Sequence, residues 1–293
     1  MAEASISVDL LNPGQVFACL GCMEAAEVLC GPCQGRFDYT DYNTSASFTL
    51  RTEGPRDPVA ETLKFLSRAK TKAVAPISST LSTKSWNVEM IQRQDTIFPC
   101  LVPDVPAALP MLLTDGHYEI RIEHWADGSN RDNVKLWAGM AGKPGAAVAL
   151  DILNAIAALD PRSLSTAVEN PFSVPCQLSS GFRLDWRRDY TAIDAGFSPN
   201  DHQNSITMVG YPFVELLAVI GLQNARPSRL DPRNKLAYRY GVSSAMLPTL
   251  FARAVLGGES PVFPIRLFRM RLGWPGKEGQ ARCIIDAQEE LVA

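Results

Sequence analysis

Histidine is scarce in this sequence, and the motifs of common enzymes are missing. The 293 residues include three histidines, His117, His124 and His202, and none of them lies in a metal-ligand or nucleophile motif. There is also no P-loop, dinucleotide fingerprint, GxSxG elbow or HExxH string. The sequence therefore predicts a non-catalytic protein without a cofactor. The alternative is a ribonuclease in which His202, in the loop-like string PNDH, acts as general acid or base.

Long apolar runs are absent as well. No stretch reaches the length of a membrane span, and the start MAEASISVDL lacks the basic and apolar regions of a secretion signal. We therefore expect a cytoplasmic protein with no membrane partner. The seven cysteines are an odd number, which argues against a disulfide framework.

Four of the cysteines form two CxxC pairs, Cys19 with Cys22 and Cys30 with Cys33. At about 100° per residue their offsets fall on one helical stripe, so a straight helix would spread the thiols along its length. A tetrahedral zinc site usually takes its ligand pairs from two facing turns. The pattern favours small buried packing residues, with a zinc site as the alternative if Gly31-Pro32 breaks the helix.

Charge is unevenly distributed along the chain. Residues 1–225 carry 17 basic and 25 acidic side chains, residues 226–282 carry 11 and 3, and the last eleven residues carry none and 3. A basic segment within a chain of net charge −3 is typical of a subunit that contacts nucleic acid on one face and protein on others. The alternative is a solvated basic surface without a ligand.

The stretch 263–283 is the centre of this basic segment. Phe268, Met270 and Leu272 alternate with Arg269 and Arg271, and a glycine-rich stretch then leads to the apolar run Cys283-Ile284-Ile285. This pattern predicts a β-hairpin with one apolar face, one basic face and a cationic tip. Guanidinium groups and exposed glycine amides both bind phosphates, so nucleic acid is the expected ligand. An ordinary edge hairpin protected by its charges is the alternative.

A second basic stretch, 226–239, has Asp231 as its single acidic residue and contains Tyr238. Together with the hairpin it gives the predicted nucleic-acid-binding set: Arg226, Arg229, Arg233, Lys235, Arg239, Arg266, Arg269, Arg271, Lys277 and Arg282. The string FRLDWRRD (182–189) also mixes arginines with aromatics, as in base stacking beside phosphate contacts. We favour instead a buried strand in which Asp185 and Asp189 neutralise the arginines.

Periodicity places a strand at 5–10, a helix at 15–30, short strands around 37–39 and 48–50, a helix around 59–66 and a strand at 73–75. This β-α-β-β-α-β order predicts an α+β protein with a ferredoxin-like region, 1–100. The Pro-, Ser- and Thr-rich stretch 76–110 is expected to be a long irregular connection. Residues 101–293 then form a mixed α+β region, with helices at 146–159, from Pro212 and around 247–256 and a strand at 118–124.

Several long strings resemble a family. They look like a CRISPR-associated protein of type I-G systems, formerly type I-U, and specifically the short, non-helicase subunit grouped near the large subunits. These strings are NPGQVFACLG (12–21), RDNVKLWAG (131–139), FRLDWRRDYTAIDAGFS (182–198), GYPFVELLAVIGL (210–222) and FRMRLGWPGKEGQARC (268–283).

The resemblance implies a non-catalytic subunit of a crRNA-guided DNA surveillance complex of the Cascade type, which acts in antiviral defence. Its implied partners are crRNA, target double-stranded DNA, the backbone and crRNA-end subunits, and a separate helicase-nuclease. In such complexes the large subunit recognises a short motif beside the target, and base pairing with the guide RNA recognises the target sequence itself. Two alternatives remain: a crRNA-processing ribonuclease of the ferredoxin-like type, and a subunit that only bridges neighbouring proteins.

Overall fold

A computed structural model describes residues 1–39, 45–94, 98, 100–123, 143–178, 181–187, 208–259, 262–274 and 282–290. The first six elements are β1 (Ala2–Asp9), α1 (Pro13–Cys30), β2 (Cys33–Asp38), β3 (Ser45–Thr52), α2 (Pro58–Arg68) and β4 (Lys70–Pro76). Their order is the predicted β-α-β-β-α-β. The mixed α+β class is thus confirmed, and this arrangement is compatible with a ferredoxin-like part.

The described residues after β4 add further strands and helices. They are β5 (Glu89–Arg93), β6 (Met111–Thr114), β7 (Glu119–Ile122), α3 (Gly145–Ala157), α4 (Pro161–Glu169), β8 (Cys176–Gln177), β9 (Val209–Gly210), α5 (Pro212–Gly221), β10 (Ser228–Arg229), β11 (Ala237–Val242), β12 (Leu247–Pro248), α6 (Thr249–Leu256), β13 (Arg266–Gly273) and β14 (Cys283–Glu290). Short 3-10 turns lie at Lys84–Trp86, Pro106–Ala108 and Pro171–Ser173. Of the described helices, none is both long and apolar enough to cross a membrane.

The strands form three four-stranded sheets and one two-stranded pair. The first sheet has the order β1-β3-β2-β12, the second β5-β4-β6-β7 and the third β10-β11-β13-β14, while β8 pairs with β9. Strand β4 therefore lies in the second sheet, where it pairs with β5 and β6. Strand β12 pairs with β2 and so joins the first sheet from late in the chain. The segment 76–110 is accordingly not irregular throughout, because it contains β5.

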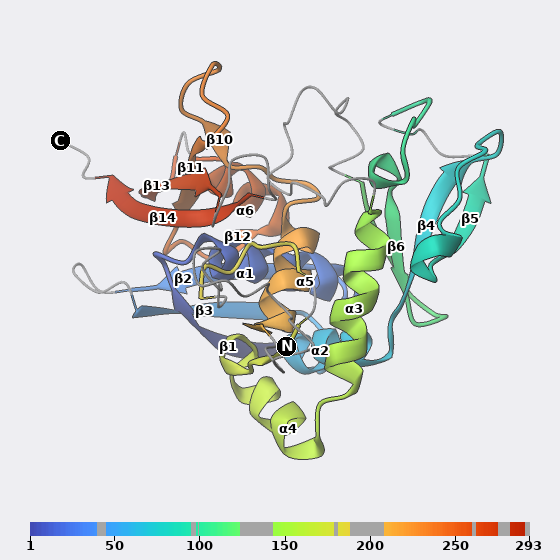
Figure 1. The fold of residues 1–293 in the computed structure, drawn as a ribbon. Coiled ribbons are helices and arrows are strands. Elements are labelled where there is room, and N and C mark those ends of the chain that lie inside the picture. The colour runs from blue at the N-terminus through green and yellow to red at the C-terminus, as the bar shows by residue number, and fades with distance from the viewer. Residues whose placement is uncertain are drawn as a thin grey trace.

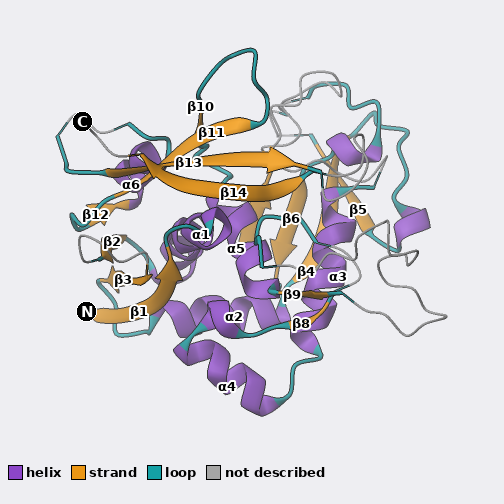
Figure 2. Cartoon of the chain, turned by 60° about the vertical axis from the view of Figure 1, so that its left-hand side comes forward, coloured by secondary structure: helices purple, strands orange, loops and turns teal. Residues whose placement is uncertain are grey.

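Helix α1 lies between the first and third sheets, as Figures 1 and 2 both show. Fifteen of its eighteen residues are buried, which is typical of a helix that is apolar on all sides. Pro13 occupies its first turn, and Gly31, with φ of 96°, follows its last residue. Both are common end signals for helices. Helix α1 thus packs between the first and third sheets, whereas the second sheet packs on α3 and α5.

Helices α1 and α5 pack closely because glycines face the partner backbone on both sides. A Cβ placed on Gly21 would lie 1.7 Å from the carbonyl oxygen of Leu217, and one on Gly221 would lie 2.1 Å from that of Phe17. A third helix, α3, packs on α5 and on β4 of the second sheet. One large hydrophobic cluster includes residues of all three sheets.

Candidate functional site

Half of the predicted nucleic-acid-binding residues lie on strands of the third sheet. Strands β13 and β14 pair antiparallel, so the predicted hairpin is present. On the inner face of β13, Phe268, Met270 and Leu272 are buried, as the alternating pattern predicts. Tyr240 on β11 stacks on Phe268, with ring centroids 5.2 Å apart, and its hydroxyl donates a hydrogen bond to the Leu10 carbonyl at 2.7 Å. The inner face thereby fixes the sheet on the body of the protein (Figure 2).

Three arginines share the outer face of this sheet. Arg239 on β11 lies directly opposite Arg269 on β13, and Arg271 follows two residues later on the same side. Glu290, near the end of β14, contacts two of them: its carboxylate oxygens lie 2.7 Å from Arg239 Nε and 3.2 Å from Arg269 Nε. Arg271 is exposed and has no carboxylate partner among the described residues. We define Arg239, Arg269 and Arg271 as the arginine row.

Arg266 lies on the other face, because it is an odd number of residues from Arg269 and Arg271 along the strand. Its side chain is 14% exposed and forms a bidentate ion pair with Glu289, in which Arg266 Nε and Nη2 each lie 2.6 Å from a carboxylate oxygen. Its guanidinium also lies 4.7 Å from the centroid of the Tyr39 ring. The hydrogen bond from Arg266 lowers the pKa of Glu289. The structure thus places Arg266 in an internal ion pair, away from the arginine row.

The other predicted cations lie around the edges of the sheet. The β10–β11 loop, which projects from the body in Figures 1 and 2, carries the exposed Arg233 and the half-buried Lys235. Arg229 donates a hydrogen bond to the Pro232 carbonyl at 3.1 Å, and Arg226 is exposed just before β10.

At the hairpin tip, the Arg282 guanidinium lies 5.4 Å from the centroid of the Trp274 ring. Lys277 falls outside the described residues. The nine predicted residues that the structure describes thus divide into the arginine row, the peripheral cations and the internally paired Arg266.

The two CxxC pairs are on α1 and at the start of β2. Cys19, Cys22 and Cys33 are buried, and Cys33 Sγ donates to the Met23 carbonyl at 3.2 Å. Burial raises the pKa of the Cys22 and Cys33 thiols to about 12 and that of Cys19 well above its ordinary value. Within the described part of the chain, no group of three or more His, Cys, Asp or Glu side chains is arranged to hold a metal ion. Cys19, Cys22 and Cys33 belong to the main hydrophobic cluster of the described residues.

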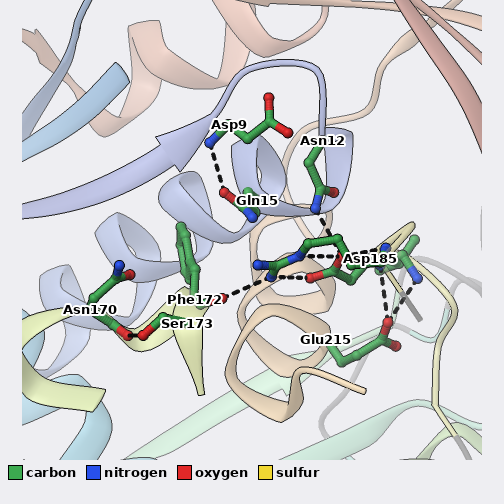
Figure 3. Close-up of polar contacts among 10 residues, drawn as sticks. Asp9, Asn12, Gln15, Asn170, Phe172, Ser173, Asp185 and Glu215 are labelled. Atoms are coloured by element: carbon green, nitrogen blue, oxygen red, sulfur yellow. Dashed lines mark hydrogen bonds and ion pairs between the residues drawn. The ribbon is translucent and has the colours of Figure 1, made fainter. Parts of the chain in front are cut away.

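A buried polar network joins α1, α5 and residues 181–187 (Figure 3). The carboxylate of Glu215 accepts hydrogen bonds from the backbone N–H groups of Arg183, Leu184 and Asp185 at 2.7, 3.0 and 3.0 Å. Asp185, 1% exposed, in turn accepts from Asn12 Nδ2 at 2.9 Å and from Arg187 Nη2 at 2.6 Å. Arg187, a member of this network, lines a polar pocket of about 280 Å³ beside β1.

The Arg187 side chain, which is 30% exposed, makes further contacts within this network. It also donates to the Phe172 carbonyl at 2.8 Å, and its guanidinium lies 3.6 Å from the centroid of the Tyr211 ring. The prediction that Asp185 neutralises an arginine is therefore correct for Arg187, although residues 181–187 are irregular rather than a strand. Asp189 lies outside the described residues. Glu215 was not predicted, because its partners are backbone groups distant in the sequence.

The candidate ribonuclease residue His202 and also His124 fall outside the described residues. His117 lies in the turn between β6 and β7, where it lines a surface groove with α2. Comparison with known proteins identifies no relative: no family model, no curated protein and no solved structure matches this chain.

Proposed function

We propose that the protein is a non-catalytic, cytoplasmic subunit of a type I-G surveillance complex, which binds target DNA, crRNA or both through the arginine row. The resemblance of its long sequence strings to that family supports membership of the complex. Its partners there would be the backbone and crRNA-end subunits and the separate helicase-nuclease. The observation that carries the nucleic-acid contact is the alignment of Arg239, Arg269 and Arg271 on the outer face of a sheet whose other face is buried.

The chemistry of this face suits phosphates. Arg269 and Arg271 are two residues apart on one strand, which separates their Cα atoms by roughly 7 Å. A guanidinium can bind a phosphate with two parallel hydrogen bonds. Arg239 and Arg269 already contact Glu290, so a phosphate would have to compete with this carboxylate. Arg271, with no described carboxylate partner, is the residue that we expect to bind most strongly.

The test is to assemble the complex with Arg269→Gln/Arg271→Gln protein and to measure target binding at several salt concentrations. Each lost phosphate contact should reduce the slope of log K against log salt by about 0.9, so we expect a reduction of roughly 2 for the double variant. Affinity should fall similarly for different target sequences, because phosphate contacts carry no base information. The matched control is Lys84→Gln, an exposed cation in the 3-10 turn before β5.

The variant Glu290→Gln provides a second test, in which we expect target affinity to change in the opposite direction. Removing this carboxylate releases Arg239 and Arg269 from their ion pairs and should tighten binding. If Arg269→Gln/Arg271→Gln binds target as wild type does in the assembled complex, the arginine row is not the nucleic-acid surface.

A bridging role between proteins is the second candidate, and exposed apolar side chains on α6 and just before β13 favour it. Leu250, Phe251 and Val262 are 68%, 48% and 76% exposed, and the ring of Phe251 packs edge-on against Phe263. Contiguous exposed apolar side chains often mark protein contacts. Crosslinking of the assembled complex decides between the candidates: a subunit that only bridges proteins gives no crosslink from its third sheet to labelled crRNA or target DNA.

A further inference from the structure

A groove of about 480 Å³ lies between α2 and the turn that joins β6 to β7, away from the third sheet. Its rim carries Arg56, Glu61, Lys64, Arg68, Asp115 and His117, and its apolar lining comes from Leu29, Phe65 and Tyr118. Pockets of 300–1,000 Å³ are the usual size for small-molecule ligands. None of the sequence patterns identified this groove, because its cations come from separate segments of an acidic region.

One side of the groove is formed by α2, and the spacing of its charged residues places them on the same face of the helix. Glu61, Lys64 and Arg68 stand three and four residues apart on α2 and so share one face of the helix. Asp57 caps this helix by accepting hydrogen bonds from the N–H groups of Val59 and Ala60 at 2.9 and 3.0 Å. Phe65, on the next turn, is 2% exposed and anchors α2 in the core. The cations therefore project from a helix whose position is well determined.

The opposite side is fixed by a tight turn. The carboxylate of Asp115 accepts hydrogen bonds from the N–H groups of His117 and Tyr118 at 3.0 and 2.9 Å. Gly116 between them has φ of 94°, a conformation that favours glycine. The bonds to Tyr118 and His117 lower the pKa of Asp115, so it remains ionised while it holds the turn. The turn thereby presents His117 and Tyr118 to the groove.

Positive charge exceeds negative charge along the groove. Glu61 is shared between Lys64, at 3.4 Å, and Arg56, at 3.7 Å. Arg56 is held further by the Leu29 carbonyl, at 2.6 Å, and a hydrogen bond with Tyr118 raises its pKa. Arg68 is exposed and has no ionic partner among the described residues. Two carboxylates, Glu61 and Asp115, thus line the groove beside three cations, and Arg68 is the one of these cations without an ionic partner in the described part of the chain.

We propose that this groove binds a nucleotide, with its phosphate at Arg68, Lys64 and His117 and its base against Tyr118. Cations alone would suit any anion, but the groove combines them with an aromatic ring and an apolar lining. Flat bases stack on aromatic side chains with little dependence on sequence. The nucleotide could be free or the end of a single strand, since both present the same phosphate and ring. The proposal does not depend on the arginine row or on membership of a surveillance complex.

The experiment is calorimetric titration of the full chain with AMP, adenosine, inorganic phosphate and a 5′-phosphorylated RNA tetranucleotide. We expect AMP to bind more tightly than adenosine and phosphate. Arg68→Glu should weaken AMP binding by about tenfold or more, since it replaces a charged hydrogen-bond donor with a repelling carboxylate. The control is Lys84→Glu, which makes the same charge change on a different surface. Circular dichroism verifies that each variant is folded.

A second variant separates the base from the phosphate. Tyr118→Leu should weaken AMP binding by several-fold and leave the binding of inorganic phosphate unchanged. If the tetranucleotide binds more than about tenfold tighter than AMP, the groove takes the end of a strand; similar affinities identify a free nucleotide. Equal affinities for AMP and inorganic phosphate, AMP binding unaffected by Arg68→Glu, or no binding at all would each overturn the proposal. Because the arginine row is not altered, these results are independent of the proposed function.

Discussion

Replacing Gly21 with alanine tests the close packing of α1 on α5. The new Cβ would lie 1.7 Å from the Leu217 carbonyl oxygen and 2.6 Å from its carbon, whereas real Cβ atoms essentially never come within 3.0 Å of such atoms. The obstructing atoms are backbone, so a side-chain rotation cannot relieve the clash. The helices must move apart by more than 1 Å, and the core around Phe17 and Gly221 must loosen with them.

The magnitude follows from two opposing effects. Alanine is favoured over glycine within a helix by about 1 kcal/mol. Overpacking of a tight core costs about 1–3 kcal/mol, and here the cost should be at the upper end because two backbones must separate. We therefore expect the free energy of unfolding to fall by about 2 kcal/mol, measured by urea denaturation with circular dichroism.

Gly54→Ala is the matched control, since its Cβ would have one neighbour, the Cys30 carbonyl oxygen, at 3.8 Å. This variant should be neutral or more stable by about 0.5 kcal/mol. A Gly21→Ala protein as stable as wild type would refute the argument for close helix contact.

Three further predictions concern buried groups. Tyr240→Phe removes the hydrogen bond to the Leu10 carbonyl while keeping the ring stack, so the free energy of unfolding should fall by about 1–2 kcal/mol in urea denaturation; an unchanged midpoint would contradict this. In the native protein, Cys19, Cys22 and Cys33 should resist iodoacetamide at pH 8, because their raised pKa values and burial keep them as inaccessible thiols, and mass spectrometry should find them labelled only after unfolding. The Arg266–Glu289 ion pair lowers the pKa of Glu289 from its ordinary value of 4.5. The stabilisation from this pair is therefore complete above about pH 4.5 and is lost as the pH falls through the lowered pKa. The difference in the free energy of unfolding between wild type and Glu289→Gln should accordingly be larger at pH 7 than at pH 3.

Local signals in the sequence were sufficient to predict the type and order of the first six helices and strands. Alternation identified β1 and β13, and Pro212 marked the start of a helix, because these effects act within a few residues. The burial of Asp185 against an arginine also followed from the sequence, although the strand expected there did not form.

Pairings between distant segments could not be predicted in this way. Strand β4 pairs with β5 and β6 in a separate sheet, and β12 pairs with β2, yet nothing near these strands specifies the partner. Glu215 accepts hydrogen bonds from backbone N–H groups some thirty residues away, so the residues around it did not indicate its role. Arg266 differs: it was predicted to bind nucleic acid, although extending the alternation of residues 268–272 by one step places it on the buried face of β13. The domain boundary near residue 100 and the nucleic-acid-binding set remain predictions.

The burial of α1 has a consequence for how the chain is made. Synthesis of its main helical neighbour, α5, is complete only when the ribosome has added residue 221, and that of the third sheet only when it has added residue 290. At typical translation rates of about 5–20 residues per second, the apolar surface of α1 stays uncovered on the ribosome for on the order of ten seconds or longer. Nascent chains of this protein should therefore be good clients for chaperones that shield apolar helices during synthesis.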